Sequence, residues 1–221
     1  MLSKRLQLAS NYIDSNLNFA DIGCDHGYLS IDAINKGVKL VQLIDNKIGP
    51  LNIAKANLKE YLSKSEVIFT LGDGLKLLDS RINIVAICGM GGDLISKILF
   101  DSLETAKRLD YLILEANSKV DRLRKFLNEE SFEILDEDFI IDRNKNYVIM
   151  KVKFSKNVKQ LNDYEIEFGP ILLDKMPLDY KENLLDKLSY IEDILTKANS
   201  DSKGQLKKKY EMIKEILNET K

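Results

Sequence analysis

The sequence predicts an α/β protein in which a seven-stranded, mainly parallel sheet is followed by a smaller helical part. Through the first two thirds of the chain, short β-branched runs alternate with longer amphipathic segments, which is typical of βαβ units. Beyond residue 156 the apolar residues follow only a helical period. A chain of 221 residues that is 44% hydrophobic is long enough for both parts. We therefore expect one domain over residues 1–156 and a helical domain over 157–221.

Seven apolar runs give the expected strands. They are Asn18–Ile22, Leu40–Ile44, Val67–Thr70, Ile84–Cys88, Tyr111–Leu114, Phe132–Ile141 and Tyr147–Phe154. Only the polar residues 142–145 separate the last two runs, and four residues are too few for a parallel crossover. These two strands should therefore form a hairpin, so that a Rossmann-like parallel sheet finishes with an antiparallel last strand.

The helical part carries two narrow apolar stripes at steps of three and four residues. The first stripe is Leu184, Leu188, Ile191, Leu195 and Ala198, and the second is Leu206, Tyr210, Ile213 and Leu217. The polar segment 199–204 joins them. This pattern predicts an antiparallel helical hairpin of the coiled-coil type, in which the stripes pack on each other. The lysines at 187, 197, 203 and 207–209 form a solvated face, or alternatively contact phosphate.

Composition limits the function classes only partly. The formal net charge is −2, yet 33 basic residues are present, so any nucleic-acid surface has to come from local clustering. No run approaches the roughly 18 apolar residues of a membrane span, and no leader is evident at the N-terminus. The two cysteines are not spaced for a disulfide framework or a metal. We expect a reduced, cytoplasmic protein with no membrane association.

The segment Phe19–Leu29 is the first candidate binding element. It passes from a strand into a helix through Gly23 and Gly27, and glycine allows close approach of a ligand or a positive φ. The helix that follows points its first amide groups toward an anion. A dinucleotide fingerprint requires G-x-G-x-x-G, whereas this loop holds acidic Asp21 and Asp25, which weakens the dinucleotide interpretation.

Two further acidic residues follow the next two strands. Asp45 ends the second strand, where a carboxylate can accept hydrogen bonds from both hydroxyls of a ribose. Asp73 lies between two glycines after the third strand, where it can accept a hydrogen bond from an adenine amino group. Each alone is an ordinary turn aspartate. Together, at successive carboxyl ends of a parallel sheet, they outline an adenosine with an amino-acid tail. The expected cofactor-binding residues are Asp21, Gly23, Cys24, His26, Gly27, Asp45, Asn46, Asp73, Gly74 and Gly89.

The fourth strand ends in the glycine-rich segment 88–92, ahead of an amphipathic helix. Enzymes that methylate exocyclic amines often carry Asn/Asp-Pro-Pro-aromatic at this place, and that motif is absent here. If this chain transfers a methyl group, a ring nitrogen or an oxygen is therefore a better acceptor than an exocyclic amine.

The chain resembles the bacterial tRNA (adenine-22, N1)-methyltransferases. The matching segments are the opening 2–7, the loop 21–29, Gly-Asp-Gly-Leu at 72–75, Gly-Met-Gly-Gly at 89–92, the strand 112–114 with Asn117, and Gly-Pro at 169–170. They cover nearly the whole chain in order. The chain departs from the family pattern at Glu115-Ala116, where Gln-Pro is usual, and at Cys24, where Ser or Thr is usual.

The resemblance implies transfer of a methyl group from S-adenosylmethionine to N1 of an adenine in the D-arm region of tRNA. N1 carries a free lone pair, so positioning should supply most of the acceleration, and a paired adenine has to be swung out to be reached. We assign Asp25 as the catalytic carboxylate, which stabilises the cationic product or accepts a proton. His26, the only histidine, should shape the cofactor site rather than act as a base, and we expect no metal.

The substrate side of the site is expected to involve Lys4, Arg5, Tyr28, Met90, Gly91 and Asn117. Tyr28 stacks on the base or is buried against its helix. Arg122, Arg124 and Lys125 on one helix, with the C-terminal lysines, are candidates for phosphate contact, and scattered solubilising charge is the alternative. Both cysteines should be structural. Nothing indicates an obligate protein partner, and the helical domain is a candidate tRNA-binding arm.

Two other functions remain open on the sequence alone. One is a methyltransferase of the same fold acting on rRNA, protein or a small molecule. The other is a non-catalytic protein that binds nucleotides or RNA and uses the helical part to dock a partner.

Overall fold

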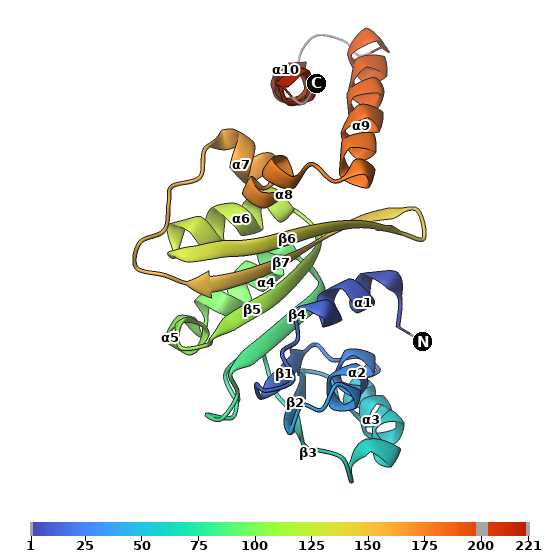
Figure 1. Cartoon of the computed structure of the whole chain (residues 1–221), viewed down its shortest axis with the longest axis vertical. Helices are drawn as coiled ribbons and strands as arrows, with labels where there is room; N and C mark the ends of the chain where they lie inside the picture. The colour runs from blue at the N-terminus through green and yellow to red at the C-terminus, as the bar shows by residue number, and fades with distance from the viewer. Residues whose placement is uncertain (1, 198–202, 220–221) are drawn as a thin grey trace.

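A computed structural model describes residues 2–197 and 203–219, and a seven-stranded sheet forms its centre (Figure 1). The strands are β1 (Phe19–Ile22), β2 (Leu40–Asp45), β3 (Glu66–Leu71), β4 (Ile84–Gly91), β5 (Tyr111–Ser118), β6 (Phe132–Asp142) and β7 (Lys145–Phe154). Their order is β3-β2-β1-β4-β5-β7-β6. All the expected strands are present, and their largest extensions are at the carboxyl ends of β4 and β5.

Helices cover both faces of the sheet. The helices of the sheet domain are α1 (Lys4–Asn11), α2 (Tyr28–Asn35), α3 (Ile48–Asn57), the 3₁₀ helix η1 (Lys59–Tyr61), α4 (Gly92–Phe100), α5 (Leu103–Lys107) and α6 (Val120–Glu129). One apolar cluster joins the sheet to α4, α5 and α6, and a second joins it to α1, α2 and α3. Because the central strands are covered on both sides, β1 and β2 are buried at every position.

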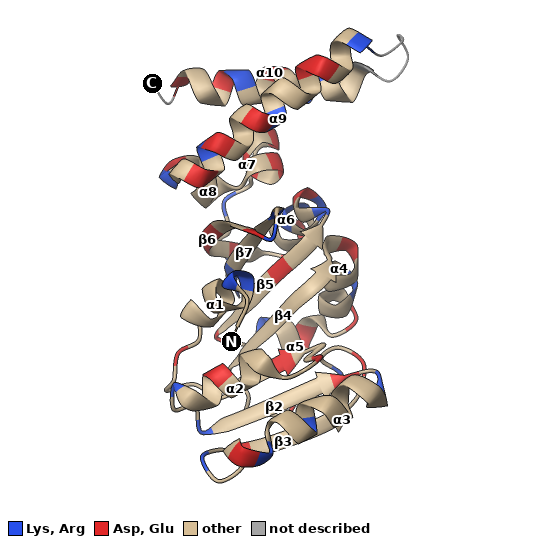
Figure 2. Ribbon diagram, turned by 90° about the vertical axis from the view of Figure 1, so that its right-hand side faces the viewer, with Lys and Arg blue, Asp and Glu red and all other residues tan. Residues whose placement is uncertain are grey.

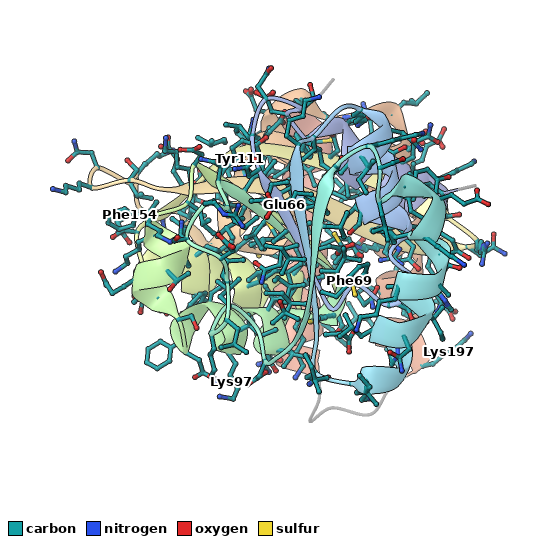
Figure 3. The ribbon with its side chains drawn as sticks, turned by 90° about the horizontal axis from the view of Figure 1, so that it is seen from below. Glu66, Phe69, Lys97, Tyr111, Phe154 and Lys197 are labelled. Carbon is teal, nitrogen blue, oxygen red and sulfur yellow. The ribbon has the colours of Figure 1, made fainter. Side chains whose placement is uncertain are left out.

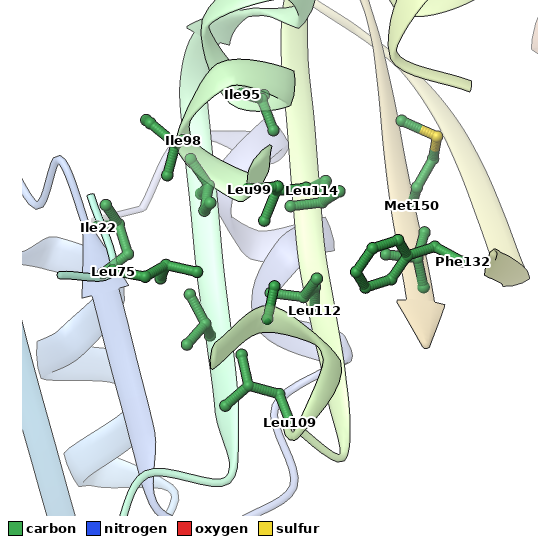
Figure 4. Close-up of a cluster of buried hydrophobic side chains, with 14 of the residues drawn as sticks. Ile22, Leu75, Ile95, Ile98, Leu99, Leu109, Leu112, Leu114, Phe132 and Met150 are labelled. Atoms are coloured by element: carbon green, nitrogen blue, oxygen red, sulfur yellow. The ribbon is translucent and has the colours of Figure 1, made fainter. Parts of the chain in front are cut away.

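The first of these clusters explains the unbroken apolar runs of the central strands. Figure 4 shows Leu112 and Leu114 of β5 facing Leu99 of α4, with Phe132 of β6 and Met150 of β7 beside them. Burial of such side chains contributes roughly 1.5–3 kcal/mol each. The cluster anchors α4 directly behind the glycine-rich end of β4.

The last two strands form the expected hairpin. β7 runs antiparallel to both β5 and β6 and lies between them. Arg143 and Asn144, the two turn residues, have φ values of 50° and 60°. Two consecutive left-handed residues are the geometry of a tight hairpin turn that matches the twist of the strands. β7 is therefore the antiparallel strand of an otherwise parallel sheet.

In the described residues beyond β7, the helices are α7 (Asp163–Phe168), α8 (Pro170–Lys175), α9 (Leu178–Lys197) and α10 (Lys203–Glu219). They enclose a third apolar cluster, which includes Leu184 and Ile191 of α9 and Ile213 of α10. The helix α10 runs back across α9 obliquely (Figures 1 and 2). The pair of helices with facing apolar stripes is confirmed, and coiled-coil packing along the whole seam stays a prediction. Ala198 and residues 199–202 of the expected loop lie outside the described residues.

A buried ion pair connects the sheet domain to these helices. Arg124 on α6 donates from Nε to Glu137 Oε1 on β6 at 2.7 Å, and both side chains are almost fully buried. The guanidinium also donates to the carbonyls of Ile166 and Glu167, and Glu137 Oε2 accepts from the Leu172 amide at 3.3 Å. Each buried charge therefore has partners in α7 or α8.

The opposite edge of the sheet is formed by β3. Figure 3 views the molecule from this edge and labels Glu66 and Phe69 on the strand. Glu66 makes an exposed ion pair with Arg81 at 2.9 Å, and the Lys55 ammonium lies 5.7 Å from the centre of the Phe69 ring. Such charges along an edge discourage pairing with another strand. Among the helices of residues 2–197 and 203–219, none is long and apolar enough to cross a membrane.

Candidate active site

A cavity of about 500 Å³ opens at the carboxyl ends of β1, β2 and β4, where the strand order reverses. Ligands of open α/β sheets bind at this switch point. The volume lies within the roughly 300–1,000 Å³ typical of small-molecule sites. The expected site residues that line it are Arg5, Asp21, Gly23, Cys24, Asp25, His26, Tyr28, Asp45, Asn46, Asp73, Gly74, Gly89 and Met90.

Four expected residues do not line this cavity. Gly27 is buried at the start of α2 and Gly91 precedes α4, whereas Lys4 is exposed on α1. Asn117 acts from outside, since its side-chain Nδ2 donates to the carbonyl of Gly89 at 2.6 Å. Gly27 and Asn117 thus support the walls of the cavity.

The two glycines of the loop after β1 are required by its shape. Gly23 and Gly27 both have φ of 70°, a left-handed conformation that favours glycine. A Cβ on Gly23 would collide with the methyl group of Met90, and a Cβ on Gly27 would lie 2.7 Å from Leu58 Cδ1. The Gly23 amide also donates to the Ile44 carbonyl at 2.8 Å. The loop is therefore packed tightly between β2 and the end of β4.

Asp21 lies at the floor of the cavity and is 5% exposed. Its Oδ2 accepts from the Ser30 hydroxyl of α2 at 3.0 Å. Burial, reinforced by the charges of Asp45 and Asp25, raises the pKa of Asp21 to about 6 despite the Ser30 hydrogen bond. A buried carboxylate in this state favours a cationic partner, because a positive charge would restore its ionised form.

The other two acidic residues differ in their surroundings. Asp45 is 8% exposed, and its Oδ1 accepts from the Lys47 amide at 2.9 Å, which fixes the carboxylate at the end of β2. Asp73 is exposed and pairs with Lys76 at 2.7 Å, and this hydrogen bond lowers the pKa of Asp73. The three carboxylates thus line one cavity, as the sequence predicts.

Asp25, His26 and Tyr28 line the cavity from its more exposed side. The Asp25 side chain is 71% exposed and lies 3.7 Å from His26 Nε2. Asp25 has φ of 46°, and an aspartate in this conformation is an uncommon feature that concentrates at functional sites. The His26 and Tyr28 rings are 5.6 Å apart, centre to centre. Tyr28 is exposed, so the alternative of a tyrosine buried against its helix is wrong.

Sequence reasoning missed a buried carboxylate at the end of β5. Glu115 is completely buried, its Oε2 forms an ion pair with Arg5 of α1, and the same oxygen accepts from the Gly89 amide at 2.8 Å. The Arg5 guanidinium also lies 5.3 Å from the centre of the Tyr147 ring. The one signal in the sequence was the departure from the Gln-Pro pattern at position 115, which does not reveal a partner 110 residues away.

Cys24 and Cys88 both line the cavity, and no base in the described part of the chain forms a hydrogen bond with either thiol. Burial is the main cause that raises the pKa of the Cys24 thiol, and it likewise raises the pKa of Cys88 well above its ordinary value. Nearby carboxylates act in the same direction. Since the thiolate is the nucleophilic form, this supports a structural role for both.

One expected basic contact is wrong. Arg124 is 2% exposed and is held by Glu137, so it is not available to a phosphate. The amphipathic pattern of α6 does not distinguish a buried arginine from an exposed one when its partner lies on a distant strand. Lys208 and Lys209 of α10 also pair with acidic residues, Asp163 and Glu167 of α7. Figure 2 shows charges of both signs mixed along α9 and α10.

Within residues 2–197 and 203–219, no group of three or more histidine, cysteine or acidic side chains is placed to hold a metal ion. The expectation of a metal-free site stays a prediction.

The parallel sheet with one antiparallel strand, and the acid-lined cavity at its switch point, define a class of Rossmann-like methyltransferases. Comparison with known proteins narrows this class. Residues 19–221 match the TrmK family, described as tRNA (adenine(22)-N(1))-methyltransferase. The chain belongs to this family.

Individual relatives agree over nearly full length. The tRNA (adenine(22)-N(1))-methyltransferase of Bacillus subtilis is 26% identical over 98% of this chain and 97% of its own. The solved structure of the B. subtilis enzyme superimposes with a TM-score of 0.81 at 25% identity, covering 98% of this chain and 99% of that one. The structure of the M. capricolum TrmK in complex with S-adenosylhomocysteine superimposes with a TM-score of 0.85 at 26% identity. The match covers 99% of this chain and 98% of that one.

Proposed function

We propose that this chain transfers the methyl group of S-adenosylmethionine to N1 of adenine 22 in tRNA, and that it works in the cytoplasm. The observation that carries the proposal is the cavity lined by Asp21, Asp45 and Asp73, which lie at or just beyond the carboxyl ends of three successive strands, in a chain of this family. The M. capricolum relative holds S-adenosylhomocysteine, the cofactor product.

The described residues fit such a cofactor. Asp21 would hold the ammonium group of the methionine end, because it is the buried carboxylate that a cation would ionise. Asp45 would accept from the ribose hydroxyls, and Asp73 from the adenine amino group. Gly23 leaves a bare backbone between these carboxylates. When bound, the cofactor supplies a methyl group on a positively charged sulfur, which a nucleophile attacks in line.

The residues that face the base are proposed to be Asp25, His26 and Tyr28. The flipped adenine would stack on Tyr28, since aromatic rings hold unstacked bases in this way. Methylation of N1 leaves a positive charge on the base, and the Asp25 carboxylate would stabilise it or accept an N6 proton. His26, 3.7 Å from Asp25, would keep that side chain at the mouth of the cavity.

Residues 157–221 are proposed to form a helical domain that is anchored on the sheet domain and contacts tRNA. Within it, α7 and α8 lie against α6 and β6, and α10 lies farthest from the sheet (Figure 1). Neutralising Lys207 and Lys214 of α10 should weaken tRNA binding and reduce its salt dependence by about one slope unit per lost phosphate contact. The same change at Lys59 and Lys64, beyond α3, is the matched control. An equal effect of both pairs would argue against a specific arm.

The activity is tested by incubation with labelled S-adenosylmethionine and an unmodified tRNA transcript, followed by nucleoside mapping. We expect one product, 1-methyladenosine at position 22, and no product from a transcript with guanosine there. A product at another position, or on rRNA, protein or a small molecule, would replace the specific proposal by another acceptor. Binding of S-adenosylhomocysteine without transfer to any acceptor would favour the non-catalytic alternative.

The catalytic assignment has its own test. Asp25→Asn should bind S-adenosylhomocysteine and tRNA normally and turn over about 100-fold more slowly, in the range usual for loss of one acid or base group. A variant with normal binding and full turnover would remove Asp25 from the chemistry.

A further inference from the structure

The ladder between β4 and β5 is irregular near the carboxyl end of β4, where it skips first Gly89 of β4 and then Asn117 of β5. Cys88 is paired with Glu115 and Met90 with Ala116, so Gly89 has no partner residue in the ladder. Gly89 has φ of 81°, which favours glycine. Because Gly89 and Met90 both line the cavity, the shape of this bulge sets one wall of the active site.

Two side chains of β5 hold the bulged residue on opposite sides. Glu115 accepts from the Gly89 amide at 2.8 Å, and Asn117 donates to the Gly89 carbonyl at 2.6 Å. A bulge removes ladder hydrogen bonds from the backbone, and here side chains replace them. Both polar groups of Gly89 are thereby fixed.

The same carboxylate also fixes the N-terminal helix. Arg5 of α1 forms an ion pair with Glu115, and its NH1 lies 3.4 Å from the place where a Cβ on Gly89 would stand. Arg5 is 23% exposed and lines the cavity, whereas Glu115 is fully buried. A single buried group therefore connects the wall of the cavity to an arginine at its surface.

Stability alone does not account for this carboxylate. Among residues 2–197 and 203–219, no group donates a hydrogen bond to the buried Glu115 Oε1, and a half-satisfied buried acid is costly. An ion pair that is costly to bury is weak evidence for a stabilising role. The geometry instead points to a role in the shape of the site.

We propose that Glu115 and Asn117 are positioning residues for methyl transfer: together they hold the Gly89 bulge that forms the acceptor side of the cavity, and Glu115 also orients Arg5 toward the tRNA. The inference rests on the proposed function for its kinetic consequence. A displaced wall misaligns the base and the methyl group, and misplacement of about 1 Å costs on the order of 100-fold in rate.

The experiment compares Glu115→Ala, Glu115→Gln and Asn117→Ala in the full chain, with Glu66→Ala as the control. Glu66 also forms an ion pair with an arginine, but at the exposed β3 edge. The measurements are kcat and KM for tRNA at saturating S-adenosylmethionine, the Kd of S-adenosylhomocysteine, and hydrogen exchange of a peptide spanning residues 85–94.

We expect Glu115→Ala and Asn117→Ala to lower kcat 10- to 100-fold and to speed exchange around Gly89, with cofactor affinity within threefold of the parent. Glu115→Gln keeps an oxygen for the Gly89 amide, so it should recover kcat to within threefold. It loses the charge that holds Arg5, so it should raise KM for tRNA severalfold. Glu66→Ala should change none of these.

Unchanged kcat in a folded Glu115→Ala variant would overturn the inference, as would a Glu115→Gln variant as slow as the alanine, since the charge and not the Gly89 bond would then matter. If Glu115→Ala does not fold, Glu115→Gln and Asn117→Ala decide the question. If the parent methylates no tRNA, the proposed function fails. The exchange measurement still tests the bulge in that case, and unchanged exchange in both alanine variants would refute it.

Discussion

Replacing Asp21 by asparagine should stabilise the cofactor-free protein at neutral pH. Burial raises the pKa of Asp21 to about 6, whereas an aspartate in an unfolded chain titrates near 3.9. Between these values the folded form binds more protons than the unfolded form, so the free energy of unfolding falls as pH rises. At about 1.36 kcal/mol per pKa unit, the loss in the free energy of unfolding reaches about 3 kcal/mol above pH 6.

The asparagine variant removes this pH dependence and keeps an oxygen that accepts from the Ser30 hydroxyl. Urea unfolding of both proteins at pH 4.5, 5.5, 6.5 and 7.5 should show a difference in unfolding free energy that grows with pH and levels off at up to about 3 kcal/mol. Asp186→Asn, on the exposed side of α9, is the control and should show no such trend. A difference that does not vary with pH, or a parent that is more stable at pH 7.5, would refute the reasoning.

Binding should move in the opposite direction. If Asp21 holds the ammonium group of the cofactor, Asp21→Asn should weaken S-adenosylhomocysteine binding at least tenfold in calorimetry, since a hydrogen bond to a charged group contributes roughly 1.5–3 kcal/mol. A variant that is more stable yet binds S-adenosylhomocysteine less tightly would show that the Asp21 carboxylate lowers the stability of the fold and strengthens cofactor binding.

Three further outcomes follow from the structure. Arg124→Ala should lower the free energy of unfolding by about 3–5 kcal/mol in urea titrations, because it leaves a buried carboxylate unpaired, and Arg81→Ala at an exposed pair should change it far less. Gly27→Ala should lower the thermal midpoint and weaken S-adenosylhomocysteine binding, since left-handed backbone costs a non-glycine residue about 1–2 kcal/mol; an unchanged midpoint would contradict the packing described for this loop. Asp45→Asn should weaken S-adenosylhomocysteine binding about 10- to 100-fold without lowering stability, and equal affinity would exclude the ribose contact.

Most of the fold follows from local pattern. The strands were predictable because β-branched runs bounded by turns mark buried strands, and the hairpin because a four-residue connection excludes a crossover. The extension of β4 to Gly91 was not predictable, since three glycines carry no strand signal and the pairing with β5 depends on a bulge. The acids of the cavity were found because strand ends of a parallel sheet converge.

The parts of the site that sequence reasoning missed depend on contacts between distant residues. Glu115 gives no sign in the sequence that it is buried, because its partner Arg5 belongs to the first helix. Arg124 was expected at the surface for the same reason: its burial is decided by Glu137 and by backbone carbonyls of α7. Periodicity gives the face of a helix, but not which charged residue on it is covered by a later segment of the chain.

The ion pair between Arg124 and Glu137 also limits which changes to the chain this protein can tolerate. Because its remaining hydrogen-bond partners are backbone groups of residues 166, 167, 171 and 172, a chain cut near residue 156 would keep both charges and lose what satisfies them. We therefore expect that the C-terminal helices cannot be replaced by those of another protein without changes in the sheet domain. A substitution at position 124 should require a matching substitution at position 137. Both also require that the backbone carbonyls of α7 and the backbone amides of α8 stay within hydrogen-bond distance of these side chains.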